Sequence, residues 1–176
     1  MMCKSIGEKS GALLDRFTVV FISNPGKKIP IWMQKSSQDG YPVVWDYHVI
    51  LYHNEDNDRA YIYDLDTALP FPCPAHEYVI KAFKPELQLK EEYQRCFRLI
   101  PARDYLREFA SDRSHMLVDG VYASPPPEYP PIETKDSKMN LYDYINMTNN
   151  SSNHKDLKYG IVINEAEFFR MALNTQ

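Results

Sequence analysis

His48 and Asp64 are the residues of this sequence whose types could do acid–base chemistry together. An imidazole titrates near neutral pH. A carboxylate beside it holds one ring nitrogen and stabilises the imidazolium, which leaves the other nitrogen free to act as a base. Such a pair is two of the three members of a nucleophile–histidine–aspartate arrangement. An ordinary cross-strand polar pair without chemistry is the competing interpretation.

A β-hairpin would bring the two residues together. Two segments rich in β-branched and aromatic residues, 43–53 and 60–66, predict its strands. If His53 pairs with Arg59, a loop of about five residues joins the strands. Antiparallel pairing then places His48 directly across from Asp64, with Cβ atoms about 4.5–5.5 Å apart. A register shifted by two residues would place His48 opposite Asp66, or diagonal to Asp64.

The alternation of side chains along the first strand argues against a metal site. Trp45, Tyr47, Val49 and Leu51 share one face, and its apolar character predicts that this face contacts the core. His48 and His53 lie on opposite faces of this strand, so their side chains point away from each other. A metal site needs more ligands than this, and His76 is not placed to supply one. We expect no metal site.

The other segments mix strand-like and helix-like patterns. Strands are predicted near 16–22, 28–34, 97–100 and 159–163, and helices near 76–83, 90–95, 102–110, 140–147 and 164–173. The last helix opens with a capping box of Asn164 and Glu167. Residues 1–12 show no clear periodicity, and Gly7 and Gly11 weaken a helix there. Together with 13 Pro against 6 Gly, this mixture predicts a rigid, loop-rich α+β domain.

Composition excludes several classes of protein. The 176 residues suit one domain, and 24 Asp+Glu against 20 Lys+Arg leave a net charge of −4, which argues against nucleic-acid binding. No apolar run approaches the roughly 20 residues of a membrane span, and the first residues lack the apolar centre of a signal peptide. Three cysteines do not make a disulfide framework. We expect a single soluble, intracellular domain.

Several motifs, in one order, give the chain a family resemblance. They are Val20-Phe21-Ile22-Ser23-Asn24, Ile29-Pro30-Ile31-Trp32, Trp45-Asp46-Tyr47-His48-Val49, Tyr63-Asp64-Leu65-Asp66-Thr67, Leu69-Pro70-Phe71-Pro72-Cys73, Ala110-Ser111-Asp112-Arg113-Ser114-His115-Met116, Ile132-Glu133-Thr134 and Asp136-Ser137-Lys138-Met139-Asn140. The chain resembles the protein N-terminal glutamine amidohydrolase family from about Leu14 to its C-terminus. On this basis we expect a divergent segment at 1–13 and one amidohydrolase domain at 14–176.

The resemblance implies both a fold and an activity. The fold would be a papain- or transglutaminase-like α+β core, with a mixed, mainly antiparallel sheet and flanking helices. The activity would be deamidation of N-terminal glutamine to glutamate with release of ammonia, by a Cys-His-Asp triad without a cofactor. The product can be arginylated, which leads into the N-degron route. The family's histidine falls on His48 and its aspartate on Asp64. The implied partners are proteins or peptides with N-terminal glutamine, not nucleic acid or membrane, and the implied enzyme is a monomer of cytoplasm and nucleus.

The nucleophile departs from the family pattern. The family's cysteine opens a helix with a Cys-x-x-Glu-Asn-x-Trp-like pattern, whereas the cysteine upstream of the first strand here is Cys3, without the Glu-Asn or the aromatic residue. Cys73 and Cys96 suit packing positions. An alternative start, a mispredicted first exon and a diverged inactive member all fit this difference. The alternative function is therefore a catalytically inactive binding or regulatory module.

Two further segments carry weaker hypotheses. Pro126-Pro127-Glu128-Tyr129 fits a PPxY docking motif, although the family carries a similar proline-rich segment within its folded body. Ser111 to Met116 is expected, from the resemblance alone, to shape the substrate pocket.

Overall fold

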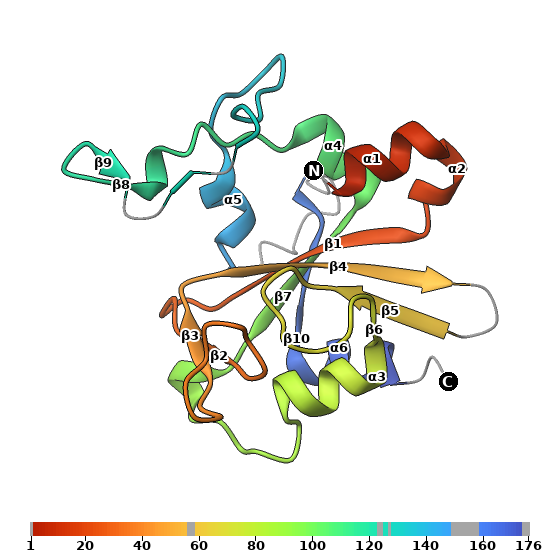
Figure 1. Cartoon of the computed structure of the whole chain (residues 1–176), viewed down its shortest axis with the longest axis vertical. Helices are drawn as coiled ribbons and strands as arrows, with labels where there is room; N and C mark the ends of the chain where they lie inside the picture. The colour runs from red at the N-terminus through yellow and green to blue at the C-terminus, as the bar shows by residue number, and fades with distance from the viewer. Residues whose placement is uncertain (1, 56–58, 123–124, 127, 149–158, 174–176) are drawn as a thin grey trace.

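A six-stranded antiparallel sheet forms the centre of the computed structural model (Figure 1). The structure describes residues 2–55, 59–122, 125–126, 128–148 and 159–173. The strand order is β10-β7-β1-β4-β5-β6, with the bounds β1 Phe17–Ser23, β4 His48–Glu55, β5 Arg59–Tyr63, β6 Cys73–Pro74, β7 Cys96–Pro101 and β10 Ile161–Asn164. Every residue of β1 except Thr18 is buried. Because alternate residues face opposite sides of a strand, both faces of this sheet are covered.

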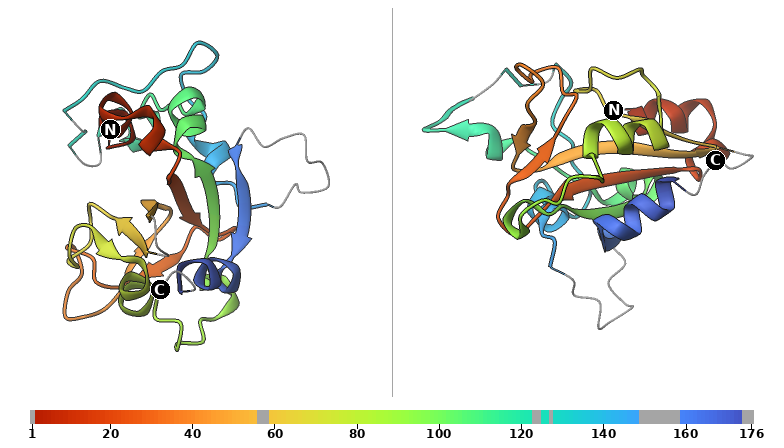
Figure 2. Two further views of the ribbon diagram at one scale, coloured as in Figure 1. Left: turned by 90° about the vertical axis from the view of Figure 1, so that its right-hand side faces the viewer. Right: turned by 90° about the horizontal axis from the view of Figure 1, so that it is seen from below.

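Helices supply that cover on both faces (Figures 1 and 2). One face carries α1 (Met2–Lys9), α2 (Gly11–Leu14), α4 (Ala102–Glu108) and α5 (Leu141–Ile145), and the other carries α3 (Ala75–Tyr78), the π-helix η1 (Val79–Phe83) and α6 (Glu165–Leu173). The first layer encloses the α4-side core, which contains Phe21, Phe109 and Tyr144. The second encloses the α6-side core, where Phe97 and Phe168 stack with ring centroids 4.2 Å apart. The predicted α+β class, with a mainly antiparallel sheet and flanking helices, is confirmed.

Short elements complete the described chain. A second sheet pairs β2 (Ile29–Ile31) with β3 (Val43–Trp45), and a third pairs β8 (Leu117–Val118) with β9 (Val121–Tyr122). Single 3₁₀ turns are η2 (Glu91–Tyr93) and η3 (Ser114–Met116). Among the described helices, none has the length and apolar character to cross a membrane.

The first residues differ from expectation, because they are helical rather than irregular. α1 and α2 occupy most of residues 2–14, and α1 packs against α4. Cys3 and Leu14 are buried in the α4-side core, with Ile6 partly buried beside them. This apolar contact outweighs the low helix propensity of Gly7. The sequence-based prediction considered only local periodicity and propensity.

The predicted register of the hairpin is wrong by two residues. Glu55, not His53, pairs with Arg59, so the connection is residues 56–58, which lie outside the described part of the chain. Connections of three and of five residues both suit a hairpin, so the loop length assumed from the sequence could not fix the register. Glu55 and Arg59 form an ion pair of 3.1 Å at the end of the hairpin, and the strands continue through both residues.

The prediction that one face of β4 contacts the core is incomplete, because both faces do. Val49 and Leu51 do contact the α4-side core, but Ile50 and Tyr52 on the opposite face are buried in the α6-side core. A strand covered on both faces is apolar on both, so alternation could not identify a single core side. Upstream, Val43–Trp45 leaves the hairpin and pairs with β2 instead.

The predicted capping box of α6 is confirmed. The backbone N–H of Glu167 donates to Asn164 Oδ1 at 3.0 Å, and the N–H of Asn164 donates to Glu167 Oε2 at 2.9 Å. The two side chains therefore satisfy each other's backbone donors at the helix start.

Candidate active site

His48 and Asp64 are in direct contact. His48 opens β4, Asp64 follows the last residue of β5, and His48 Nε2 lies 2.9 Å from Asp64 Oδ1. Both residues are buried. The contact forms although Asp64 lies beyond the paired part of β5, whose last pair at this end is Leu51 with Tyr63. His48 and Asp64, selected from the sequence, are thus adjacent in the register shifted by two residues, which was the alternative that placed them diagonally.

Asp64 is held by four hydrogen-bond donors. Oδ1 accepts from His48 Nε2 and from the backbone N–H of Asp66 at 2.9 Å, and Oδ2 accepts from Tyr78 at 2.7 Å and from Gln34 Nε2 at 3.2 Å. Burial alone would raise the pKa of Asp64, but the hydrogen bonds from His48, Tyr78 and Asp66 lower it below the ordinary 3.8. The carboxylate is therefore ionised at neutral pH.

The ionised carboxylate determines the tautomer of His48. A carboxylate without a proton can only accept, so the hydrogen of the imidazole is on Nε2. Nδ1 then carries the lone pair and is the nitrogen available for proton exchange. The ring is also held from the side by Trp45, whose centroid lies 5.0 Å away.

Tyr78 and Gln34 were not identified from the sequence. Tyr78 comes from α3 and Gln34 from the loop after β2, and both side chains are buried. Burial and the charge of Asp64 raise the pKa of Tyr78 well above its ordinary value, so it remains a donor. A tyrosine in an apolar helix is usually a packing residue, and no spacing rule connects it with Asp64.

One group among the described residues has the donor atoms to bind a cation. A ring nitrogen of His48 and carboxylate oxygens of Asp64 and Asp66 lie within 4.8 Å of one another. His48 Nε2 is already engaged with Asp64 Oδ1, and Asp64 Oδ2 accepts from Tyr78 and Gln34. The hydrogen bonds to Asp64 thus suit a histidine–aspartate pair better than a metal centre.

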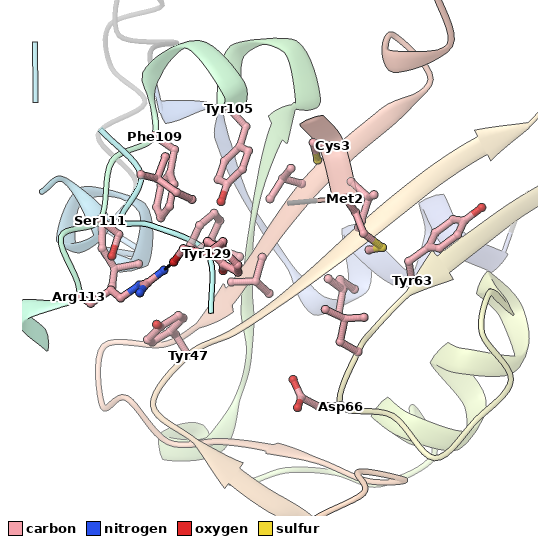
Figure 3. A pocket seen from close by; sticks show the side chains of 18 of the residues that line it. Met2, Cys3, Tyr47, Tyr63, Asp66, Tyr105, Phe109, Ser111, Arg113 and Tyr129 are labelled. Carbon is pink, nitrogen blue, oxygen red and sulfur yellow. Dashed lines mark hydrogen bonds between the residues drawn. The ribbon is translucent and has the colours of Figure 1, made fainter. Parts of the chain in front are cut away.

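A cavity of about 330 Å³ lies between the sheet and α1, α4 and the segment after α4 (Figure 3). Its walls are mainly aromatic and aliphatic: Met2, Cys3, Val19, Phe21, Tyr47, Val49, Ile50, Leu51, Tyr63, Leu65, Tyr105, Phe109, Met116, Tyr129, Ile132 and Leu141, with Asp66, Ser111, Arg113 and His115 as its polar members. Asp66 belongs both to this wall and to the cluster around His48. Asp66 therefore connects the cavity wall with the histidine–aspartate pair. The cavity's volume suits one amino-acid side chain and its backbone.

The segment from Ser111 to Met116 lies in this wall, as the resemblance implied. Tyr47 OH lies 3.2 Å from His115 Nε2, which links the residue before His48 to this segment. Burial, and next the charge of Asp46, raises the pKa of Tyr47 to about 12, so the phenol stays protonated. Burial also lowers the pKa of His115. The pair is a neutral polar contact in an otherwise apolar wall.

The three cysteines occupy different surroundings. Cys3 lines the cavity from α1, on the side away from Asp66 in Figure 3. Burial raises the pKa of its thiol, and no hydrogen bond joins it to His48 in the described structure. Cys73 is fully buried in the α6-side core, where burial raises its pKa to about 11, and Cys96 is half-buried on β7. Cys3 is thus the cysteine placed to meet a ligand.

Tyr129, the tyrosine of the PPxY segment, contacts the folded domain. The guanidinium of Arg113 lies 5.0 Å from the centre of the Tyr129 ring and donates a hydrogen bond to the Tyr129 carbonyl. Tyr129 also lines the cavity. Pro127 lies outside the described residues.

Comparisons with known proteins agree with these observations. The model of the N-terminal glutamine amidase family matches residues 1–172. A zebrafish (Danio rerio) relative named protein N-terminal glutamine amidohydrolase is 52% identical over 147 residues, which cover 83% of this chain and 73% of the relative. Relatives of the same name from Homo sapiens and Drosophila mojavensis are 49% and 44% identical; the alignments cover 83% and 84% of this chain, and 72% and 73% of the relatives.

Proposed function

The chain belongs to the N-terminal glutamine amidase family, and on this basis we propose that it hydrolyses the side-chain amide of N-terminal glutamine in proteins and peptides. The products would be an N-terminal glutamate and ammonia. The observation that carries the proposal is the buried contact of 2.9 Å between His48 Nε2 and Asp64 Oδ1, which leaves Nδ1 as the basic nitrogen. The cavity-lining Asp66 lies within 4.8 Å of this pair.

The proposed steps follow thiol chemistry. An amide carbon is a weak electrophile, so the attack needs a thiolate and not a thiol. His48 Nδ1 takes the thiol proton as the sulfur attacks the side-chain carbonyl carbon, and later gives that proton to the departing ammonia. Water, deprotonated by the same nitrogen, then hydrolyses the thioester. His48 would act as both base and acid in one turnover.

Asp64 would position His48 without exchanging the proton itself. Its charge stabilises the imidazolium that forms when the thiol loses its proton. Tyr78 and Gln34 hold the other carboxylate oxygen, so Asp64 cannot rotate away from the ring. Gln34, Asp64 and Tyr78, which come from separate segments of the sequence, would thus together hold the imidazole in one orientation.

Cys3 is the proposed nucleophile of this chain, because it is the cysteine that lines the cavity. Its thiol would have to approach His48 in the substrate complex and lose its proton there. The test is ammonia release from a Gln-initiated peptide by the wild type and by Cys3→Ala. Cys96→Ala is the matched control, since Cys96 is outside the cavity wall. Activity that survives in Cys3→Ala would exclude Cys3 as the nucleophile.

A specific observation favours a second candidate, a binding module without turnover. The thiol of Cys3 is buried with a raised pKa and has no hydrogen bond to His48 among the described residues. Such a protein would bind a Gln-initiated peptide and release no ammonia. Folded wild type that gives this result in parallel binding and ammonia assays would support the module and exclude the enzyme.

The remaining expectations from the resemblance are part of the same proposal. We propose protein substrates with N-terminal glutamine that enter the N-degron route, a monomeric protein of cytoplasm and nucleus, and no nucleic-acid or membrane partner. Size-exclusion chromatography with light scattering tests the monomer. Microscopy of the tagged full chain tests the location.

A further inference from the structure

Asp66 carries a free carboxylate at a fixed position. Its backbone N–H donates to Asp64 Oδ1 at 2.9 Å, and its carbonyl accepts from the N–H of Lys35 at 2.7 Å. The side chain itself is exposed, and within the described residues it forms no hydrogen bond or ion pair. The main chain thus anchors Asp66, while its charge remains available to a ligand.

This carboxylate belongs both to the cluster around His48 and to the cavity wall. One of its oxygens is within 4.8 Å of a His48 ring nitrogen. Asp66 is also the acidic residue among the side chains that line the cavity, where Arg113 and His115 are the basic ones. Figure 3 shows Asp66 at the lower edge of the cavity and Arg113 on the left. A cationic group in this cavity would be drawn toward Asp66, next to His48.

An N-terminal glutamine brings such a cation. It differs from an internal glutamine by its α-ammonium group, which four bonds separate from the side-chain carbonyl carbon, a span of at most about 5 Å. The separation of Asp66 from His48 is of the same size. A glutamine whose side-chain carbon is beside His48 can therefore place its α-ammonium at Asp66. An internal glutamine would place a neutral amide there and leave the carboxylate without a charged partner.

We propose that Asp66 is the counter-ion of the substrate's α-ammonium group, and so the residue that makes the site specific for glutamine at a chain terminus. The inference rests on the proposed function, because it assumes that glutamine is the ligand. A charge-assisted hydrogen bond between an ammonium and a carboxylate is among the stronger polar contacts in proteins. Asp66 would act in recognition, whereas His48 and Asp64 would act in the reaction.

The test compares two peptides that differ at one group. One begins with glutamine, and the other is the same peptide with the α-amino group replaced by hydrogen. We would measure the dissociation constant of each by calorimetry, and the ammonia release from each, for the wild type, Asp66→Asn and Asp66→Glu. Asp119→Asn is the control, because it removes one exposed charge at the β8–β9 turn, outside the cavity wall. All proteins are first checked for equal thermal unfolding.

The expected result is a loss of discrimination. The wild type and Asp119→Asn should prefer the peptide with the free amine at least about tenfold at pH 7, since a charge-assisted contact of this kind carries more than about 1.4 kcal/mol. Asp66→Asn should bind both peptides alike, with unchanged affinity for the deaminated one, and Asp66→Glu should keep part of the preference. The wild-type preference should fall above about pH 8, where the α-amine loses its proton.

The inference and the proposed function fail in different ways. Ammonia release without any preference for the free amine, or a preference that persists in Asp66→Asn, would overturn the role of Asp66 and leave the function standing. Preferential binding that requires Asp66 but yields no ammonia would support the role of Asp66 and overturn the enzyme. An equal loss of affinity for both peptides in Asp66→Asn would assign the residue a structural role instead.

Discussion

Tyr78 donates its hydroxyl hydrogen to Asp64 Oδ2 at 2.7 Å, on the carboxylate oxygen opposite the one that contacts His48. The tyrosine is fully buried, and it comes from α3 on the α6-side of the sheet. Because both carboxylate oxygens are engaged, the carboxylate can neither rotate nor draw in a different donor. The orientation of His48 therefore depends on a residue that does not touch it.

Tyr78→Phe should weaken the contact between His48 and Asp64 and lower the stability of the protein. The change removes one donor and leaves Gln34 alone on Asp64 Oδ2, so the pKa of Asp64 should rise from its lowered value. We expect a loss of about 1–3 kcal/mol in the free energy of unfolding, measured by urea denaturation. Tyr142→Phe, at an exposed position on α5, is the control and should change little. Equal stability of the two variants would contradict the role given to Tyr78.

Asp64→Asn should abolish most of the proposed activity while the protein still folds. An amide can donate as well as accept, so it no longer requires the hydrogen of His48 to be on Nε2, and it cannot stabilise the imidazolium. We expect ammonia release to fall by about 10³–10⁴-fold. The comparison is with Asp119→Asn, which should retain wild-type rates. A loss of less than tenfold would show that Asp64 does not act through His48.

The same substitution predicts how stability responds to acid. The pKa of Asp64 is lowered in the folded protein, so its contribution to stability is present above its unfolded pKa near 3.8 and is lost as the pH falls through the lower folded value. The melting temperature should therefore fall less steeply in Asp64→Asn than in the wild type when the pH is lowered from about 5 to about 2, the range of the carboxyl titrations. Parallel curves would show that the carboxylate is not stabilised by its donors.

His53 should make the protein sensitive to mild acid. Its ring stacks on Phe17 with centroids 4.1 Å apart, and its buried Nε2 has no hydrogen-bond partner among the described residues. Burial lowers its pKa below 6.5. The neutral form is favoured by folding, so stability is present above pH 6.5 and is lost as the pH falls through the lowered value. His53→Phe keeps the stacked ring without the titration, and its melting temperature should fall less between about pH 7 and pH 5. His76→Gln, at an exposed site, should behave as the wild type.

Asn164→Ala should destabilise the C-terminal helix. The substitution removes the side-chain oxygen that accepts the N–H of Glu167, and with it half of the capping box. We expect a loss of about 1 kcal/mol in the free energy of unfolding, measured by chemical denaturation. Arg170→Ala changes an exposed residue of the same helix and is the control. If both substitutions cost the same, the cap contributes nothing to stability.

Local sequence was enough to predict several elements, and in each case the signal lay within a few residues. The apolar, β-branched composition of 16–22 predicted β1, and Asn164 with Glu167 predicted the start of α6. Short-range pattern failed where distant contacts decided the outcome. α1 forms because it has the α4-side core to pack on. The paired part of the hairpin runs from Leu51–Tyr63 to Glu55–Arg59, not from His48–Asp64 to His53–Arg59.

Local pattern identified most of the central strands, the start of α6, the family motifs, and His48 and Asp64 as residues able to act together. Only the tertiary structure brought Gln34 and Tyr78 onto Asp64, and placed Asp66 in the wall of a cavity whose other residues range from Met2 to Leu141. The physical reason is that periodicity sets which side of an element a residue faces, whereas the order of the strands and the packing of the helices set what it meets there.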